Sequence, residues 1–289
     1  MRYSIFVLAV LFVLVAFLLS SCSQPTTSQE TPTPIATPVP ISTPTGPVHN
    51  LTQDKYYATI QAAIDDARNG DEIMVSRGTY NENIDFRGKD ILLRSEDPGN
   101  PSIVATTIID GGGRGSVVTF KQGETNRAAL MGFTVRNGSG TLTSFGYSGG
   151  GIYIDNASPA IVSNMIKDNH AFDGGGIYIH GQSNAGILSN IIEENIAYGS
   201  GGGIAVEGSS SPTILGNTFR YNRAVFAGGG IFVGVWANVE DIMGNYWLRR
   251  NCPPAGAEAN GVWTYQSNTF SGNLHQNGQP TAGCHVYFY

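Results

Sequence analysis

Alternating apolar and polar positions, punctuated by a recurring glycine triplet, organise the chain between residues 149 and 251. The tetrapeptide Gly-Gly-Gly-Ile begins at Gly149 and returns at Gly174, Gly201 and Gly228, in steps of 25, 27 and 27 residues. An Asn-x-x-x-x-Asn segment follows each of the first three copies, at positions 164–169, 190–195 and 217–222. A period of roughly 20 to 50 residues indicates a repeat architecture, in which each copy stacks on the next.

The residues after each glycine triplet alternate between two kinds of column. One kind is aliphatic, with Ile152, Ile177, Ile204 and Ile231, and then Ile154, Ile179, Val206 and Val233. Between these two lie Tyr153, Tyr178, Ala205 and Phe232. A period of two predicts a strand with one face in the core. Two or three short strands per repeat would form one coil of a single-stranded parallel β-helix, with coils about 4.8 Å apart.

The repeated glycines and asparagines have a structural interpretation. Glycine adopts the positive φ of sharp corners, and asparagine tolerates the left-handed region while its amide bonds to neighbouring backbone. We expect the column Asn169, Asn195 and Asn222 to form an amide ladder. The alternative, asparagine as a ligand for sugar or metal, is weaker because the columns recur in every coil.

These repeats resemble the right-handed parallel β-helix repeat family of the pectin-lyase-like superfamily. They also resemble the repeats of polymorphic outer-membrane proteins. The resemblance covers roughly residues 57–289 and implies an all-β, right-handed parallel β-helix whose open end is covered by a short amphipathic helix. Residues 60–68 fit that helix, with Thr59 as its N-cap and Asn69-Gly70 at its end. At about 25 residues per coil, residues 71–289 should form roughly eight or nine coils.

The N-terminal residues predict export and anchoring. Residues 1–21 form a targeting segment whose apolar run, 5–19, is shorter than the roughly 20 residues of a membrane span. Leu19-Ser-Ser-Cys22 resembles a bacterial lipobox, which implies that Cys22 carries the lipid; an ordinary signal peptide with an incidental cysteine is the alternative. Residues 22–48 hold seven of the 14 prolines and predict a disordered tether. The domain 49–289 would then lie outside the cytoplasm, lipid-anchored to the cell envelope.

The other two cysteines, Cys252 and Cys284, are expected to form a disulfide. Three cysteines less a lipidated one leave two, in an oxidising compartment. Two free buried thiols are the alternative.

Charge and composition narrow the partners. The chain has a net charge of −6 and 13% charged residues, as in an exported globular domain. Residues 149–219 carry six acidic side chains against Lys167 alone, which disfavours nucleic acid and anionic membrane surfaces. The five histidines show no ligand spacing, and the Ile109–Gly115 turn lacks the carboxylate of the calcium-binding repeat it half resembles. We expect no metal, no cofactor, and a monomer.

Catalytic signals are sparse. The segments that carry catalysis in the pectin methylesterases, pectate lyases and polygalacturonases of this superfamily are absent. The Gly78-x-Tyr80-x-Glu82 segment also opens pectin methylesterases, but it marks the first coil of many non-catalytic relatives too. The sequence therefore leans away from an enzyme; if the protein is one, a polysaccharide lyase or glycoside hydrolase is expected.

The outward columns of the glycine-triplet strands are the candidate site. Alternation places Tyr153, Tyr178 and Phe232 on the outer face, where rings could stack on sugars. Asp155, His180 and Glu207 follow two residues along, as candidate catalytic groups. Asp155 and Glu207, two coils apart, would be separated by about 9.6 Å, near the range of an inverting glycosidase. The simpler alternative is an exposed strand with ordinary charge pairing.

Three functional hypotheses follow. The first is a surface protein that binds, or also processes, polysaccharide. The second is a non-catalytic adhesin or structural spacer, and the third a true lyase or hydrolase. Aromatic and carboxylate side chains in one groove would favour sugar, whereas an even polar surface would favour a spacer.

Overall fold

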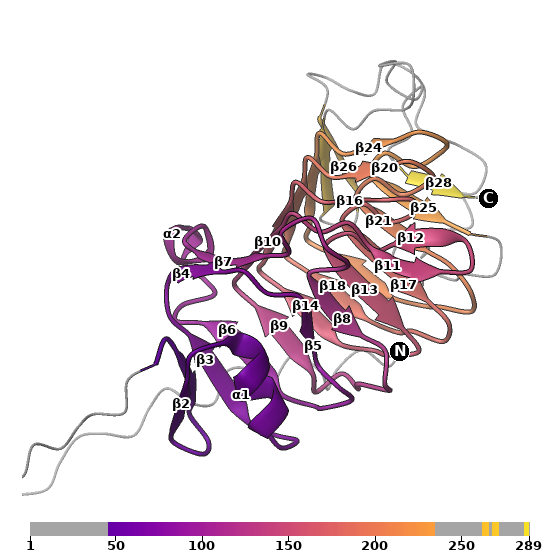
Figure 1. Cartoon of the computed structure of the whole chain (residues 1–289). Helices are drawn as coiled ribbons and strands as arrows, with labels where there is room; N and C mark the ends of the chain where they lie inside the picture. Colours follow the sequence, from indigo (N-terminus) through magenta and orange to yellow (C-terminus); the bar gives the residue numbers. More distant parts are fainter. Residues whose placement is uncertain (1–45, 235–261, 266–267, 272–285, 289) are drawn as a thin grey trace, which may run out of the picture. The chain divides into compact units, whose positions relative to one another are not determined.

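The computed structural model describes residues 46–234, 262–265, 268–271 and 286–288 (Figure 1). These residues form a parallel β-solenoid in which three sheets run along the stack of coils. Each coil contributes one strand to each sheet in turn, and residues at matching positions of successive coils are paired in register. The repeat seen in the sequence is therefore one turn of the solenoid.

The strands fall into three long sheets and two short ones. The first sheet contains β2 (Lys55–Tyr57), β1 (Val48–Asn50), β3 (Glu72–Val75), β6 (Leu92–Ser95), β9 (Ala129–Met131), β14 (Ala160–Val162), β18 (Gly186–Leu188) and β22 (Thr213–Leu215). The second contains β4 (Gly78–Tyr80), β7 (Thr107–Asp110), β10 (Thr134–Arg136), β15 (Met165–Lys167), β19 (Ile191–Glu193), β23 (Thr218–Arg220), β27 (Asn268–Ser271) and β26 (Val262–Tyr265). The third contains β5 (Ile84–Asp85), β8 (Val118–Phe120), β13 (Ile152–Asp155), β17 (Ile177–His180), β21 (Ile204–Val206), β25 (Ile231–Val233) and β28 (Val286–Phe288). The short corner sheet consists of β16 (His170–Ala171), β20 (Ile196–Ala197) and β24 (Arg223–Ala224), and a hairpin of β11 (Thr141–Thr143) and β12 (Gly146–Ser148).

The inward columns form the core, as the alternation predicts. Ile152, Ile177, Ile204 and Ile231 are register partners and fully buried. Ile161, Ile187 and Ile214 form a matching column in the first sheet. Removing each such side chain from water contributes roughly 1.5–3 kcal/mol, but only once a neighbouring coil covers it.

Two asparagine ladders tie the coils together at the corners. The predicted column is confirmed, because the Nδ2 of Asn169 donates to the Oδ1 of Asn195, which donates in turn to Asn222, each at 3.0 Å. A second ladder links Asn164 to Asn190 at 3.1 Å and Asn190 to Asn217 at 3.0 Å. These side chains are buried, so their mutual hydrogen bonds offset the cost of removing amides from water.

The predicted cap is confirmed as α1 (Ile60–Asp66), which ends two residues earlier than expected. Thr59 Oγ1 accepts the Ala62 amide at 3.2 Å, and the Glu82 carboxylate accepts the amides of the first two helical residues at 2.9 Å. This capping accounts structurally for the Gly78-x-Tyr80-x-Glu82 segment. Antiparallel β1 covers the edge of β3, so the first parallel strand is not left open.

The coil count is lower than predicted. The first sheet supplies six parallel strands, β3 to β22, within the described residues. Their starts, Glu72 and Thr213, are 141 residues apart over five steps, or about 28 residues per coil. The helix α2 (Pro101–Val104) and the β11–β12 hairpin lengthen the early coils, so a period of 25 overestimates the number.

Several predictions concern residues outside the described ranges. Cys22, Cys252 and Cys284 all lie there, as do the targeting segment and nearly all of the predicted tether. Lipidation and the disulfide therefore stay predictions. No helix among the described residues is long and apolar enough to cross a membrane.

Candidate functional site

The predicted sugar-binding rings are buried. Tyr153, Tyr178 and Phe232 lie on the outer face of the third sheet, as alternation requires, but only 1 to 8% of each residue is exposed. With Ala205 and Ala227 they form a second apolar cluster, separate from the solenoid core. We call these three rings the ring column. The prediction that they are available to stack on sugars is wrong.

A second layer of chain explains this burial. The first glycine of each triplet has a φ between 64° and 71°, a left-handed turn that glycine adopts without strain. The turn packs the glycine directly against the strand that follows: a Cβ added at Gly174 would lie 2.9 Å from the Cα of Tyr178. The residues just before the triplets, including Ala227, then cover the rings. Period-two alternation reports the side of the strand and not what lies above it.

The three candidate catalytic side chains do lie on neighbouring coils. Asp155 and His180 are register partners, with Oδ1 and Nδ1 3.0 Å apart. Tyr178 donates its hydroxyl hydrogen to Glu207 Oε2 at 2.7 Å, and its ring stacks on the His180 ring with centroids 5.9 Å apart. Each group thus has a partner within the sheet, the pairing expected of the simpler alternative. A catalytic role for them stays a prediction.

Burial shifts the pKa values of the hydroxyls in this region. The pKa of Tyr153 rises to about 12, first because the hydroxyl is desolvated and then because the Asp155 carboxylate is near. Desolvation, followed by Glu207, raises the pKa of Tyr178 as well. Both phenols therefore stay protonated and act as hydrogen-bond donors.

Asp173 lies beneath this layer, just before the second glycine triplet. It is 8% exposed, and its Oδ1 accepts the Ser200 amide at 2.7 Å. Burial raises the pKa of Asp173 from 3.8 to about 6, and the Glu207 carboxylate raises it further against the effect of the Ser200 bond. Asp173 joins its own coil to the next while facing the Tyr178–Glu207 pair.

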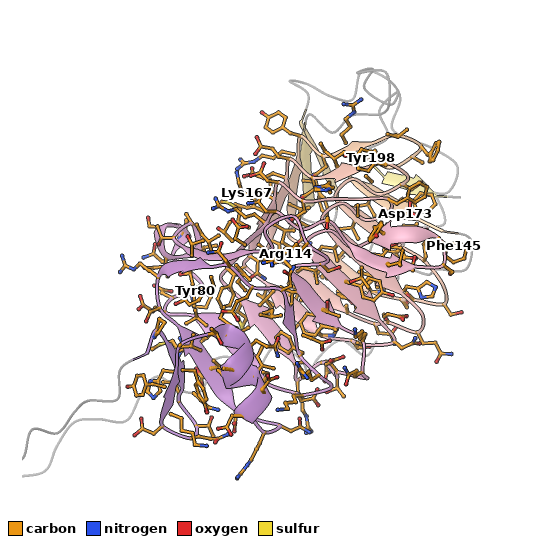
Figure 2. The ribbon with its side chains drawn as sticks, in the orientation of Figure 1. Tyr80, Arg114, Phe145, Lys167, Asp173 and Tyr198 are labelled. Atoms are coloured by element: carbon orange, nitrogen blue, oxygen red, sulfur yellow. The ribbon has the colours of Figure 1, made fainter. Side chains whose placement is uncertain are left out.

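A different set of rings is exposed. Tyr147, Phe172, Tyr198 and Phe226 are 39 to 60% exposed and come from four successive coils, beside the corner sheet. We call them the aromatic ridge. The Phe172 and Phe226 rings meet edge to face with centroids 6.4 Å apart, and Tyr198 meets the His170 ring at the same distance. Figure 2 shows Tyr198 and Phe145 on the flank that carries the hairpin and corner sheet, away from Lys167.

Sequence reasoning missed this ridge although the signal is present. An aromatic residue recurs two or three positions before each of the four glycine triplets. The columns considered lay only after the triplets, where the alternation is regular. The residues before them do not alternate, so a period search gives them no weight.

A cleft of about 330 Å³ opens along the ridge. Tyr147, Phe172 and Tyr198 line it together with Ser139, His170 and Ala171. Its lining residues include no carboxylate, lysine or arginine. The cleft combines ring faces with a hydroxyl and an imidazole.

Charged residues gather elsewhere, on the outer face of the second sheet. Arg136 pairs with Asp110 at 2.8 Å, Lys167 with Glu194 at 3.3 Å, and Arg220 with Glu193. Among the described residues, no group of three or more histidine, cysteine, aspartate or glutamate side chains is arranged to hold a metal ion.

Comparison with known proteins agrees with this architecture. Residues 130–287, more than half of the chain, match the family model described as a right-handed β-helix region. No curated protein matches the chain, and no solved structure matches it. The matched range includes the described coils that carry the ring column, the aromatic ridge and the cleft.

Proposed function

The chain belongs to the right-handed β-helix family, and from that premise we propose that it is a surface protein that binds polysaccharide through the aromatic ridge. The β-helix fold supports a surface or polysaccharide-related protein. The observation that carries the proposal is the row of exposed rings beside an open cleft on four successive coils.

The chemistry of the cleft suits a sugar. Aromatic rings present flat apolar faces that pack on the C–H faces of pyranoses, while phenol hydroxyls supply hydrogen bonds at the ring edge. Ser139 and His170 add polar groups among the rings, the mixture expected of a site that orients a hydroxylated ligand. A spacer would need neither feature.

Binding without turnover fits this cleft better than hydrolysis does. A glycosidase usually needs two carboxyl groups beside the scissile bond, and no carboxylate lines the cleft. Asp173 follows the ridge residue Phe172, but it is buried and accepts the Ser200 amide. Asp155 and Glu207 belong to the third sheet and are absent from the cleft lining.

A glycan array with the full chain is the first test, followed by titration of a bound glycan. We expect Tyr198→Ala to weaken binding about tenfold, because one stacked ring contributes about 0.5–1.5 kcal/mol beyond its burial. Tyr221→Ala is the matched control, since Tyr221 is equally exposed, at 61%, but does not line the cleft. An array without any bound glycan, or equal affinities for the two variants, would overturn the proposal.

We further propose that the protein is exported and held on the cell envelope through Cys22. The motivation is the Leu19-Ser-Ser-Cys22 segment followed by a proline-rich tether. Cys22→Ala expressed in the native host should move the protein from the membrane to the soluble fraction. Retention in the membrane would show that the anchor is elsewhere.

A further inference from the structure

The aromatic ridge runs across the strands, along the stack of coils. The Phe172 amide donates to the Tyr147 carbonyl at 2.6 Å, and the Gly199 amide donates to the Phe172 carbonyl at the same distance. The Phe226 amide continues the series by donating to the Gly199 carbonyl at 2.9 Å. Four coils are crossed in three steps of about 4.8 Å, so the ridge extends over about 14 Å.

Gly199 allows the rings on either side of it to form one surface. Phe172 and Phe226 lie two coils apart, yet their ring centroids are only 6.4 Å from each other. A Cβ at Gly199 would lie 3.1 Å from the Phe172 ring, so a larger residue would occupy the space over which Phe172 leans. Tyr198 points instead toward His170. The ridge is therefore an extended track of rings and not a single enclosed pocket.

The cleft covers only part of this track. Its volume of about 330 Å³ is near the lower end for pockets that enclose a whole small ligand, and Phe226 is not among its lining residues. A ligand that contacts all the exposed rings must extend beyond the cleft along the coil axis. This geometry favours a chain over a single sugar.

The charges around the track argue about the chain's chemistry. Neither a lysine nor an arginine lines the cleft, so no cation there would neutralise a polyanion. The nearest carboxylate in sequence, that of Asp173, is buried. Recognition must come from ring faces and uncharged hydrogen-bonding groups.

Building on the proposed function, we propose that the ridge binds an uncharged, extended glycan chain of roughly three or more pyranose rings, lying along the coil stack. The cleft holds part of the chain, and Phe226 contacts a sugar farther along. Affinity depends on chain length and is insensitive to salt, because no charges pair.

The test titrates the full chain with uncharged cello-, xylo- and manno-oligosaccharides of two and six units, and with oligogalacturonates of the same lengths. We expect at least one uncharged hexasaccharide to bind at least tenfold more tightly than its disaccharide. Its affinity should change less than twofold between 50 and 500 mM NaCl. Phe226→Ala should weaken the hexasaccharide about tenfold and leave the disaccharide unchanged.

Controls separate this inference from the proposed function. Arg223→Gln removes an exposed cation that follows the ridge's own corner, and Tyr221→Ala removes an exposed ring away from the cleft; neither should change hexasaccharide binding. Equal affinity for both uncharged lengths, or salt-sensitive binding of oligogalacturonate alone, would overturn the inference while leaving polysaccharide binding in place. Failure of every oligosaccharide here and of every glycan on the array would overturn both.

Discussion

Two sets of aromatic residues occupy the same coils and have opposite exposures. The ring column, Tyr153, Tyr178 and Phe232, is buried beneath a second layer of chain, whereas the aromatic ridge lies open at the corner just before the glycine triplets. The residues are of the same types and recur with the same period. What separates them is the left-handed glycine turn, which folds the chain over one set and leaves the other outside. In a solenoid, then, an outward-facing residue is not necessarily an accessible one.

The largest effect should come from removing a ring of the column. Tyr178→Ala should lower the free energy of unfolding by about 3–5 kcal/mol, as expected for a fully buried aromatic residue. Tyr198→Ala on the ridge should change it by less than about 0.5 kcal/mol. Urea unfolding of the full chain measures both. Similar small losses in the two variants would mean that the ring column is not a core.

Tyr178→Phe sharpens this comparison, because it keeps the ring and removes the hydroxyl. It should cost about 1 kcal/mol, the net worth of the hydrogen bond to Glu207. A cost as large as that of Tyr178→Ala would show that the hydrogen bond, and not the packing of the ring, dominates.

Next in size is a pH effect from Asp173, which lies between the two sets of rings. Its pKa is about 6 in the folded protein against an ordinary 3.8, so the folded state binds the proton more tightly. The resulting stability is fully present below pH 3.8 and is lost as the pH rises through 6, by up to about 3 kcal/mol. Asp66, Asp71 and Asp110 have lowered pKa values, so their opposite contributions change mainly below this window.

Asp173→Asn should flatten this dependence. Unfolding free energies from pH 4 to pH 7, measured for the two proteins in parallel, should converge at low pH and favour the variant at pH 7. Parallel curves across the whole range would show that Asp173 does not carry the raised pKa.

A smaller loss is expected from closing the space between the ridge rings. Gly199→Ala should cost about 1–3 kcal/mol through overpacking against Asp173 and Phe172, and it should weaken glycan binding severalfold by displacing Phe172. Gly186→Ala is the matched control, because a Cβ there meets nothing closer than 3.8 Å. Unfolding and glycan titration should separate the two; equal behaviour would mean that Gly199 is not needed for space.

The smallest effect is a gain. Tyr221 is an exposed aromatic residue outside the cleft with a φ of 58°, a left-handed conformation that strains a non-glycine residue. Tyr221→Asn should stabilise the protein by about 1 kcal/mol, since asparagine adopts this conformation more readily, and should leave glycan binding unchanged. Thermal unfolding measures the gain; a loss would show that the Tyr221 ring contributes packing.

The fold was predictable because its determinants repeat. Ile152 and Ile177 need only be recognised as equivalent for the strand, the coil and the core to follow, and the Asn169 ladder follows from amide chemistry. The coil count was not predictable in the same way, since the hairpin and α2 interrupt the period without changing it. The candidate site depends on what packs above Tyr178 and on residues such as Phe172 that precede the turn. Neither is encoded in a periodic pattern.

The asparagine ladders have a consequence for how such a chain can evolve. Each internal asparagine both receives a bond from the coil before and gives one to the coil after, so any coil is an acceptable neighbour for any other. An in-frame duplication of one repeat would therefore insert between existing coils without leaving an amide unsatisfied. Each duplication would also bring its own residue in front of the glycine triplet and lengthen the ridge by about 4.8 Å. Ligand reach in this lineage would then change in discrete increments, through copy number before point substitution.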